Sequence, residues 1–143
     1  MAKVILEPLG RNWQEYLTPE IYQEHLENMK KREEKILQER EKVSQGWGEK
    51  YEKRVHDKGK LTVYERIELL KDEGSTVYPL GTFVNHGLEY PIGNTLRTSP
   101  GAGVFTGFVK VSGKYVMVIA NDNRVASGSW WPKTPEKIIR AQE

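Results

Sequence analysis

Cysteine is absent from the 143-residue chain, which excludes disulfide bonds, thiolate metal sites and a cysteine nucleophile. The three histidines, His25, His56 and His86, lie far apart and show no metal-ligand spacing. A short apolar stretch near the start is broken by Glu7 and Arg11, so it predicts neither a signal peptide nor a membrane span. These absences predict a cytoplasmic protein with no metal site and no membrane span.

Neither sign of charge dominates the chain, which has 22 Lys plus Arg and 20 Asp plus Glu. Residues 1–74 carry 15 basic and 16 acidic side chains, whereas residues 75–143 carry 7 basic and 4 acidic ones. This excess is too small to indicate a nucleic-acid partner. It would help a site in the carboxyl-terminal half to hold an anion.

The sequence predicts a long helix over residues 20–45, because no glycine or proline interrupts this run. Thr18-Pro19-Glu20 has the features of a helix start: a hydroxyl N-cap, a proline at the first turn and then an acid. Apolar residues recur along one stripe among many charges; they are Tyr22, Leu26, Met29, Ile36 and Val43. We expect a solvated helix that packs a narrow face against another element or subunit.

Gly46 and Gly48 predict the end of this helix, with Trp47 between them as an anchor. A basic stretch follows, whose cations are Lys50, Lys53, Arg54, Lys58 and Lys60. These cations suit phosphate oxygens, but acidic residues are interleaved with them, which favours an ordinary solvated surface.

A second helix is predicted to begin after Thr62, because Glu65 completes a capping box three residues later. Its buried face would consist of Ile67, Leu69 and Leu70. Gly74 would end it as a left-handed C-cap.

Residues 76–102 are predicted to form an irregular segment that is functional or held by a partner, since ordinary connections are much shorter. Beyond it, residues 104–111 read as a strand, Ser112-Gly113-Lys114 as a tight turn and residues 115–120 as a second strand. This second strand is apolar on both faces, so we expect it to be an interior strand.

The loop NDNRVASGSWWP leads from this strand into a helix that begins at Thr134-Pro135-Glu136. Its small residues would let a ligand approach the backbone. Free N–H groups at residues 134–137, with the cations Arg124, Lys133 and Lys137, would suit phosphate oxygens. The alternative is structural, with glycine forming a turn and the tryptophans covering the core. Asp122 is suited to act as a base or a metal ligand, but we favour a loop cap that accepts backbone N–H groups.

Three segments in order resemble the acyl-CoA carboxyltransferases of the biotin-dependent carboxylase and decarboxylase family. They are HDKGKLTVYERIELLKDEGS, GTFVNHG and the stretch from GVFTGFVKVSGKYVMVIAND to the last residue. The resemblance covers residues 56–143, and its strength lies in the order and spacing of the three segments.

The resemblance implies an α+β fold in three parts. Amino-terminal helices occupy residues 1–75, and a connecting segment occupies residues 76–102. Residues 103–143 form the first strand-strand-helix turn of a crotonase-like (ClpP/crotonase) domain, which would be incomplete. The glycine-rich loop that polarises a thioester or biotin carbonyl in the family would come after Glu143, so we expect no catalytic residue in this chain.

The resemblance also implies that the loop after the second strand lies along coenzyme A, with Arg124, Ala126, Ser127, Gly128, Ser129 and Lys137 as the CoA-binding residues. The commonest form of the family has two adjacent glycines where this chain has Ser127-Gly128. Trp130-Trp131-Pro132 is bulkier than in many carboxylases and resembles the decarboxylase branch.

The function implied is that of the amino-terminal part of a transferase, a ligase component, that moves a carboxyl group between biotin and an acyl-CoA. Biotin would be held on a carrier-protein partner, and the coenzyme A thioester would be the substrate. We expect an oligomer with the rest of the carboxyltransferase or a partner subunit, and no activity from the chain alone. The alternative is a non-catalytic subunit or assembly module of a split carboxyltransferase or biotin-dependent decarboxylase.

Overall fold

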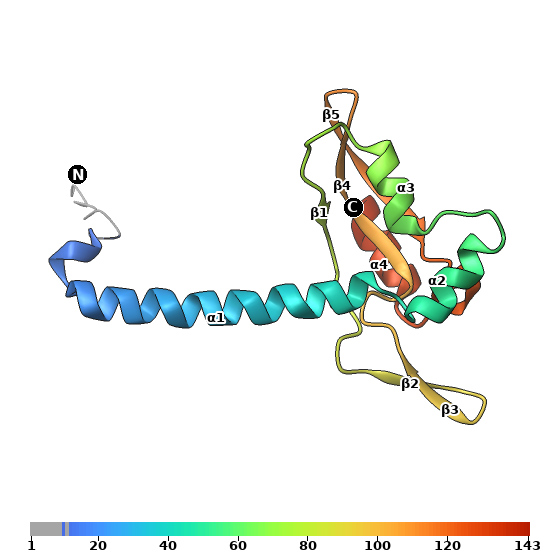
Figure 1. Cartoon of the computed structure of the whole chain (residues 1–143), viewed down its shortest axis with the longest axis horizontal. Coiled ribbons are helices and arrows are strands. Elements are labelled where there is room, and N and C mark those ends of the chain that lie inside the picture. Colours follow the sequence, from blue (N-terminus) through green and yellow to red (C-terminus); the bar gives the residue numbers. More distant parts are fainter. Residues whose placement is uncertain (1–9, 11) are drawn as a thin grey trace, which may run out of the picture. The chain divides into compact units, whose positions relative to one another are not determined.

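The computed structural model describes residue 10 and residues 12–143 (Figure 1). The sequence predicts neither a signal peptide nor a membrane span at the amino terminus. Most of that stretch lies outside the described residues. The described residues up to Gln38 form one compact unit, and residues 39–143 form another. Among the described helices, none combines the length and the apolar character that crossing a bilayer requires.

The first long helix, α1 (Pro19–Ser44), follows a short 3-10 turn at Trp13–Glu15. The Thr18 hydroxyl accepts the Ile21 amide at 3.4 Å, so the predicted start is confirmed. None of its residues is buried, and Met29 and Ile36 are 59% and 50% exposed. Tyr22, Leu26 and Val43, the other residues of the stripe, are half-buried, and the Trp13 ring stacks on Tyr22. The expected contact of the stripe with another subunit stays a prediction.

Trp47 is the predicted anchor at the end of α1. Its indole N–H donates to the Thr98 carbonyl at 2.9 Å, and its ring meets the Trp131 ring edge-on at 5.5 Å between centroids. The basic stretch that follows forms α2 (Glu49–His56), with Val55 as its buried residue. Trp47 thus holds the turn between α1 and α2 against the rest of residues 39–143.

Helix α3 (Val63–Leu70) begins with the predicted capping box, in which the Thr62 hydroxyl accepts the Glu65 amide and the Glu65 carboxylate accepts the Thr62 amide. The predicted buried face was partly wrong. Val63 and Ile67 are buried, whereas Leu69 is 76% exposed and Leu70 46% exposed. A helix of two turns buries one i, i+4 pair against the sheet, and residues two or three positions beyond Ile67 turn away from it.

The predicted C-cap at Gly74 was also wrong. The backbone becomes extended at Lys71, the C-cap residue. Asp72 then accepts the amides of Ser112 and Gly113 at 2.6 and 2.7 Å, which ties the end of the helix to the hairpin turn of the sheet. Gly74 adopts its positive φ of 70° in a later turn, which the bond from the Ser75 amide to the Asp72 carbonyl closes.

An antiparallel sheet forms from β1 (Tyr78–Pro79), β4 (Val104–Val111) and β5 (Lys114–Asn121), in the order β1-β4-β5. Ser112 and Gly113 form the two-residue turn between β4 and β5, with φ of 50° and 81°. Two positive values are what a tight hairpin with the right-handed strand twist requires. Both predicted strands are confirmed within a residue at each end.

Residues 76–102 are less irregular than predicted. Besides β1 they contain a hairpin of β2 (Glu89–Ile92) and β3 (Thr95–Thr98). Most of its side chains are exposed. Its sequence therefore lacks the alternation of apolar and polar residues that predicts a strand.

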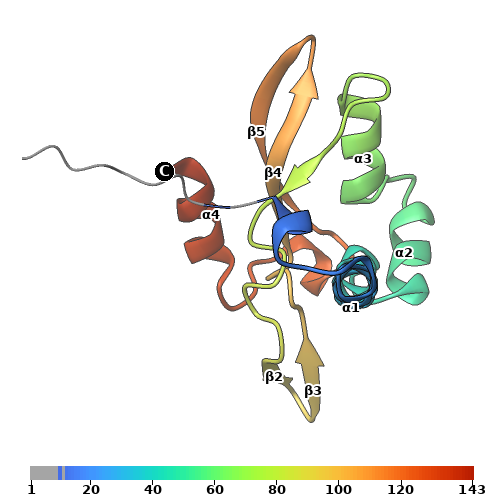
Figure 2. The same ribbon diagram turned by 90° about the vertical axis from the view of Figure 1, so that its left-hand side faces the viewer.

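Strand β4 is the covered strand, with α3 on one side of the sheet and α4 (Thr134–Gln142) on the other (Figure 2). The core lies on the α3 side, where Val63 and Ile67 pack with Phe105 and Val109. Strand β5 is an edge strand, half exposed at residues such as Val116. The prediction that β5 is the interior strand was wrong in the described chain, because both helices pack chiefly on its neighbour.

Candidate functional site

The loop between β5 and α4 leaves the sheet at Asp122, whose amide donates to the Gly103 carbonyl at 2.9 Å. Val125 is buried beneath the loop. A Cβ on Gly103 would lie 3.1 Å from a Val125 methyl group, so the small residue on the neighbouring strand end lets the loop sit close to the sheet. The contacts of Asp122 and Val125 with Gly103 thus fix the position of the loop relative to the sheet.

A buried ion pair anchors the first turn of this loop. The Asp122 carboxylate accepts the Arg124 amide at 2.9 Å and two guanidinium N–H groups at 3.0 Å each. The Arg124 side chain is 4% exposed and the Asp122 side chain 8%. Asp122 is therefore the loop cap that we favoured, and its oxygens are occupied within the protein.

The Arg124 guanidinium also reaches beyond the loop. It donates to the Ser44 carbonyl at 2.6 Å and lies 5.2 Å over the ring of Tyr64. Burial opposes its charge, but the hydrogen bonds and charge of Asp122 raise the pKa of Arg124 above its ordinary value. The same burial, with the nearby carboxylate of Asp122, raises the pKa of Tyr64 to about 12. Arg124 thus joins the loop, the end of α1 and α3.

The turn Ala126–Gly128 is strained. Three successive residues, Ala126, Ser127 and Gly128, have φ of 47°, 57° and 85°, a region that costs energy for every residue except glycine. The amides of Gly128 and Ser129 donate to Val125 and Ala126 carbonyls. The amides of Ala126 and Ser127 make no hydrogen bond within the described part of the chain. Strain that the surroundings maintain is typical of ligand-binding turns.

Helix α4 begins at Thr134, as predicted, but most of its amino-terminal N–H groups are not free. Lys133 is the N-cap residue in a left-handed conformation, and Thr134 is the first helical residue. The Thr134 hydroxyl accepts the Trp131 amide and donates to the Ala102 carbonyl, while its own amide donates to Trp131. The Lys137 amide is bonded to Lys133 and residue 135 is proline, so the free N–H groups that we expected at residues 134–137 are mostly occupied or missing.

The two lysines of this region are also engaged. The Lys133 ammonium pairs with Glu136 at 3.0 Å. The Lys137 ammonium is buried and donates to the carbonyls of Gly101 and Val104 at 2.9 and 2.6 Å. Burial lowers the pKa of Lys137 to about 8. Lys137 therefore ties α4 to the chain that enters β4.

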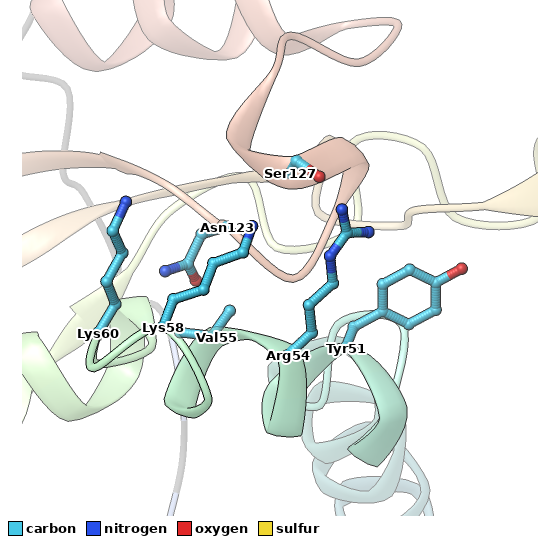
Figure 3. A pocket seen from close by; sticks show the side chains of 7 residues that line it. All are labelled: Tyr51, Arg54, Val55, Lys58, Lys60, Asn123 and Ser127. Carbon is cyan, nitrogen blue, oxygen red and sulfur yellow. The ribbon is translucent and has the colours of Figure 1, made fainter.

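A pocket of about 70 Å³ lies between α2 and the loop (Figure 3). Its residues come from α2 and the turn after it, which contribute Tyr51, Arg54, Val55, Lys58 and Lys60, and from the loop, which contributes Asn123 and Ser127. The cations that face the loop are thus those of the basic stretch, which the sequence favoured as plain solvated surface. The signal was the density of cations in this stretch. Arg54 lies on α2, whereas Lys58 and Lys60 lie in the turn that follows it.

Of the six predicted CoA-binding residues, the structure brings Ala126, Ser127, Gly128 and Ser129 together in one strained turn. The side chains of Arg124 and Lys137 lie inside the protein, below and beside that turn. Among the described residues, no group of three or more His, Asp or Glu side chains has the geometry of a metal site.

Comparison with known proteins identifies the family. Residues 54–143 match the carboxyl transferase domain family. The chain is 38% identical over 98 residues to the biotin-dependent 3-methylcrotonyl-coenzyme A carboxylase beta1 subunit of Mycobacterium tuberculosis, covering 68% of this chain and 17% of that protein. It is 37% identical over 101 residues to the methylmalonyl-CoA decarboxylase subunit alpha of Veillonella parvula, covering 71% and 19%.

Among solved structures, the transcarboxylase 12S hexamer with methylmalonyl-coenzyme A and methylmalonic acid bound superposes with a TM-score of 0.68 and 27% identity, covering 79% of this chain and 22% of that one. The chain thus spans about a fifth of the length of the relatives that it matches. The likeness confirms the predicted α+β class and the start of a crotonase-like domain. This chain belongs to the carboxyl transferase domain family of the biotin-dependent acyl-CoA carboxylases and decarboxylases, as the three sequence segments predicted.

Proposed function

We propose that the chain supplies the coenzyme A shelf of a carboxyltransferase that moves a carboxyl group between biotin, carried on a partner protein, and an acyl-CoA. The observation that carries this proposal is the strained turn at residues 126–128, whose two free amides lie beside a cationic pocket. A carboxylase subunit and a decarboxylase subunit match the chain at 38% and 37% identity. The similarity therefore supports the carboxyl-transfer step that both reactions share.

In this proposal the backbone of Ala126, Ser127, Gly128 and Ser129 contacts the CoA. Arg124 and Lys137 act as positioning residues. Arg124 fixes the loop to the end of α1, and Lys137 fixes α4 to the start of β4. This differs from the role of direct phosphate ligands that the sequence suggested for them. Biotin would meet the acyl group in an assembly with partner subunits.

Calorimetric titration of CoA into the full chain, in the assembly in which it purifies, tests the proposal. A Cβ at Gly128 would meet only ordinary contacts, the nearest at 3.7 Å from the Asn123 Cα atom. Gly128→Val therefore fits sterically, but it forces a β-branched residue to keep a φ of 85° and covers the turn. We expect it to weaken CoA binding by roughly tenfold or more.

The matched control is Gly93→Val, in the turn of the β2–β3 hairpin. Gly93 has a φ of 55° and open space around it, so this variant carries similar backbone strain away from the loop. It should bind CoA as the unchanged chain does. Equal affinity in the unchanged chain and both variants would show that the loop is structural and would remove the CoA shelf from the proposal.

A further inference from the structure

The pocket between α2 and the loop is cationic. Three of its seven lining residues are Arg54, Lys58 and Lys60, and no lining residue is a carboxylate. None of these three cations takes part in an ion pair within residues 10 and 12–143. Lys133 and Arg124, the cations that the sequence favoured, are both paired. Lys137, the third of these cations, has no carboxylate partner within the described residues, but it is buried against the Gly101 and Val104 carbonyls. In the described part of the chain, the cations that stay both exposed and unpaired beside the loop are therefore those of the pocket.

The local sequence explains why the three cations face one way. Helix α2 ends at His56, and Gly59, with a φ of 66°, allows the chain to reverse. The Gly59 and Lys60 amides donate back to the His56 and Val55 carbonyls at 2.8 and 3.2 Å, which closes the turn. Figure 3 shows Lys58, Lys60 and Arg54 projecting from this segment toward the loop.

The opposite wall is built by the loop. The Asn123 amide nitrogen donates to the Leu61 carbonyl at 3.1 Å, which fixes this side chain in place. Its oxygen is buried and has no donor within the described residues. A buried acceptor requires a donor, so this oxygen is suited to a lysine ammonium and not to a phosphate oxygen. Ser127 adds a hydroxyl, and the free amides at residues 126 and 127 belong to the same turn.

We propose that this pocket binds the 3′-phosphate of the acyl-CoA, a step that rests on the proposed function for the identity of the ligand. A volume of about 70 Å³ is several times the ~10–15 Å³ that one water molecule needs, but far too small for a nucleotide. The pocket therefore fits one phosphate group, while the rest of the nucleotide lies outside it.

Charge complementarity favours the 3′-phosphate over the pyrophosphate of the same ligand. A phosphate monoester carries about −1.5 to −2 charges near pH 7 and presents three strong acceptor oxygens. Three separate cations match such a group. Each phosphorus of the pyrophosphate carries one charge and is linked on two sides, which suits backbone amides such as those of the loop.

The experiment compares CoA with dephospho-CoA, which lacks the 3′-phosphate, by calorimetric titration into the full chain. The variants are Arg54→Ala and Lys58→Ala, both at exposed positions. Truncation there should leave the fold intact, which far-UV circular dichroism checks. Lys53→Ala is the matched control, because Lys53 is an exposed cation of the same helix outside the pocket.

We expect CoA to bind at least roughly tenfold tighter than dephospho-CoA, as one charged contact is worth about this factor. Each pocket variant should lose roughly tenfold in CoA affinity and keep its affinity for dephospho-CoA, while the control changes neither. The preference for CoA should also shrink as salt is added, since the cations are exposed.

Equal binding of the two ligands, or pocket variants that weaken both alike, would overturn the assignment. If the pocket variants bind CoA normally while Gly128→Val does not, the pocket inference fails and the proposed function stands. If the unchanged chain binds neither ligand, adenosine 3′,5′-bisphosphate decides. If this compound binds and the pocket variants lose it, the pocket is a phosphate site but the proposed CoA shelf is contradicted. If it does not bind, both the pocket assignment and the CoA shelf are overturned.

Discussion

Arg124→Ala should destabilise the chain by about 3–5 kcal/mol, the usual cost of removing one partner of a buried ion pair. The substitution removes the two guanidinium donors at 3.0 Å from the Asp122 carboxylate, whose side chain is only 8% exposed in the unchanged chain. It also removes the donor at 2.6 Å from the Ser44 carbonyl. Because small domains are stable by about 5–15 kcal/mol, a loss of this size leaves the fold marginal.

Two further variants separate charge from geometry. Arg124→Lys keeps the positive charge but lacks the planar fork that bonds both carboxylate oxygens, so it should cost about 1–3 kcal/mol. Combining Arg124→Ala with Asp122→Ala removes the stranded carboxylate, so the double variant should be less destabilised than the sum of the two single variants.

The assay is urea unfolding followed by circular dichroism and tryptophan fluorescence, with linear extrapolation to water. Arg140→Ala is the control, since the Arg140 side chain is 83% exposed and should cost less than about 0.5 kcal/mol. If Arg124→Ala unfolds within about 1 kcal/mol of the unchanged chain with the same slope, the buried pair does not hold the loop.

Other perturbations follow from single contacts. Gly107→Ala places a Cβ 2.7 Å from the Tyr78 carbonyl oxygen and should cost about 1–3 kcal/mol by overpacking; an unchanged urea midpoint would contradict it. His56 and the Thr62 amide lower the pKa of Glu65 to about 2, so stability should fall as the pH falls from about 4.5 toward 2. Glu65→Gln should reduce this loss of stability at low pH, and an unchanged dependence of stability on pH in the variant would contradict the role of Glu65. The pKa of Lys137 falls on folding from 10.5 to about 8. Between these two pH values the unfolded chain binds more protons than the folded chain, so the free energy of unfolding should rise from pH 8 to 10.5. Lys137→Met should lose this rise. Thermal melts at several pH values measure it, and the same rise in the variant would contradict the assignment.

Features that depend on neighbours in the sequence were predictable. The capping box at Thr62 and Glu65 is confirmed, because both halves of it lie within four residues. The tight turn at Ser112-Gly113 is confirmed for the same reason, since the turn chemistry belongs to the two residues themselves. The order of three family segments identified the fold before any coordinate was known.

Features that depend on distant partners were not predictable. Leu69 is as apolar as Ile67, and only the position of β4 decides which of the two is buried. The fate of Lys137 depends on two carbonyls more than thirty residues earlier in the chain. The sequence named Arg54 as one of five cations of a solvated surface, which its exposure bears out. That it shares a pocket with Ser127 depends on the folding of residues 39–143. A local sequence pattern shows that a cation is present, but it does not show whether the folded chain pairs or buries that cation.

The outer edge of β5 has a consequence for how the chain behaves during refolding. In the described chain this strand has a neighbour on one side only, and six successive residues from Tyr115 to Ala120 carry neither a charge nor a proline. Such an edge offers unpaired backbone groups to any other strand of similar character. Correct folding is first order in protein, whereas edge-to-edge capture between two chains is second order. The recovered fraction should therefore decline as refolding is attempted at higher concentration, and dilution or a second strand that covers the edge should restore it.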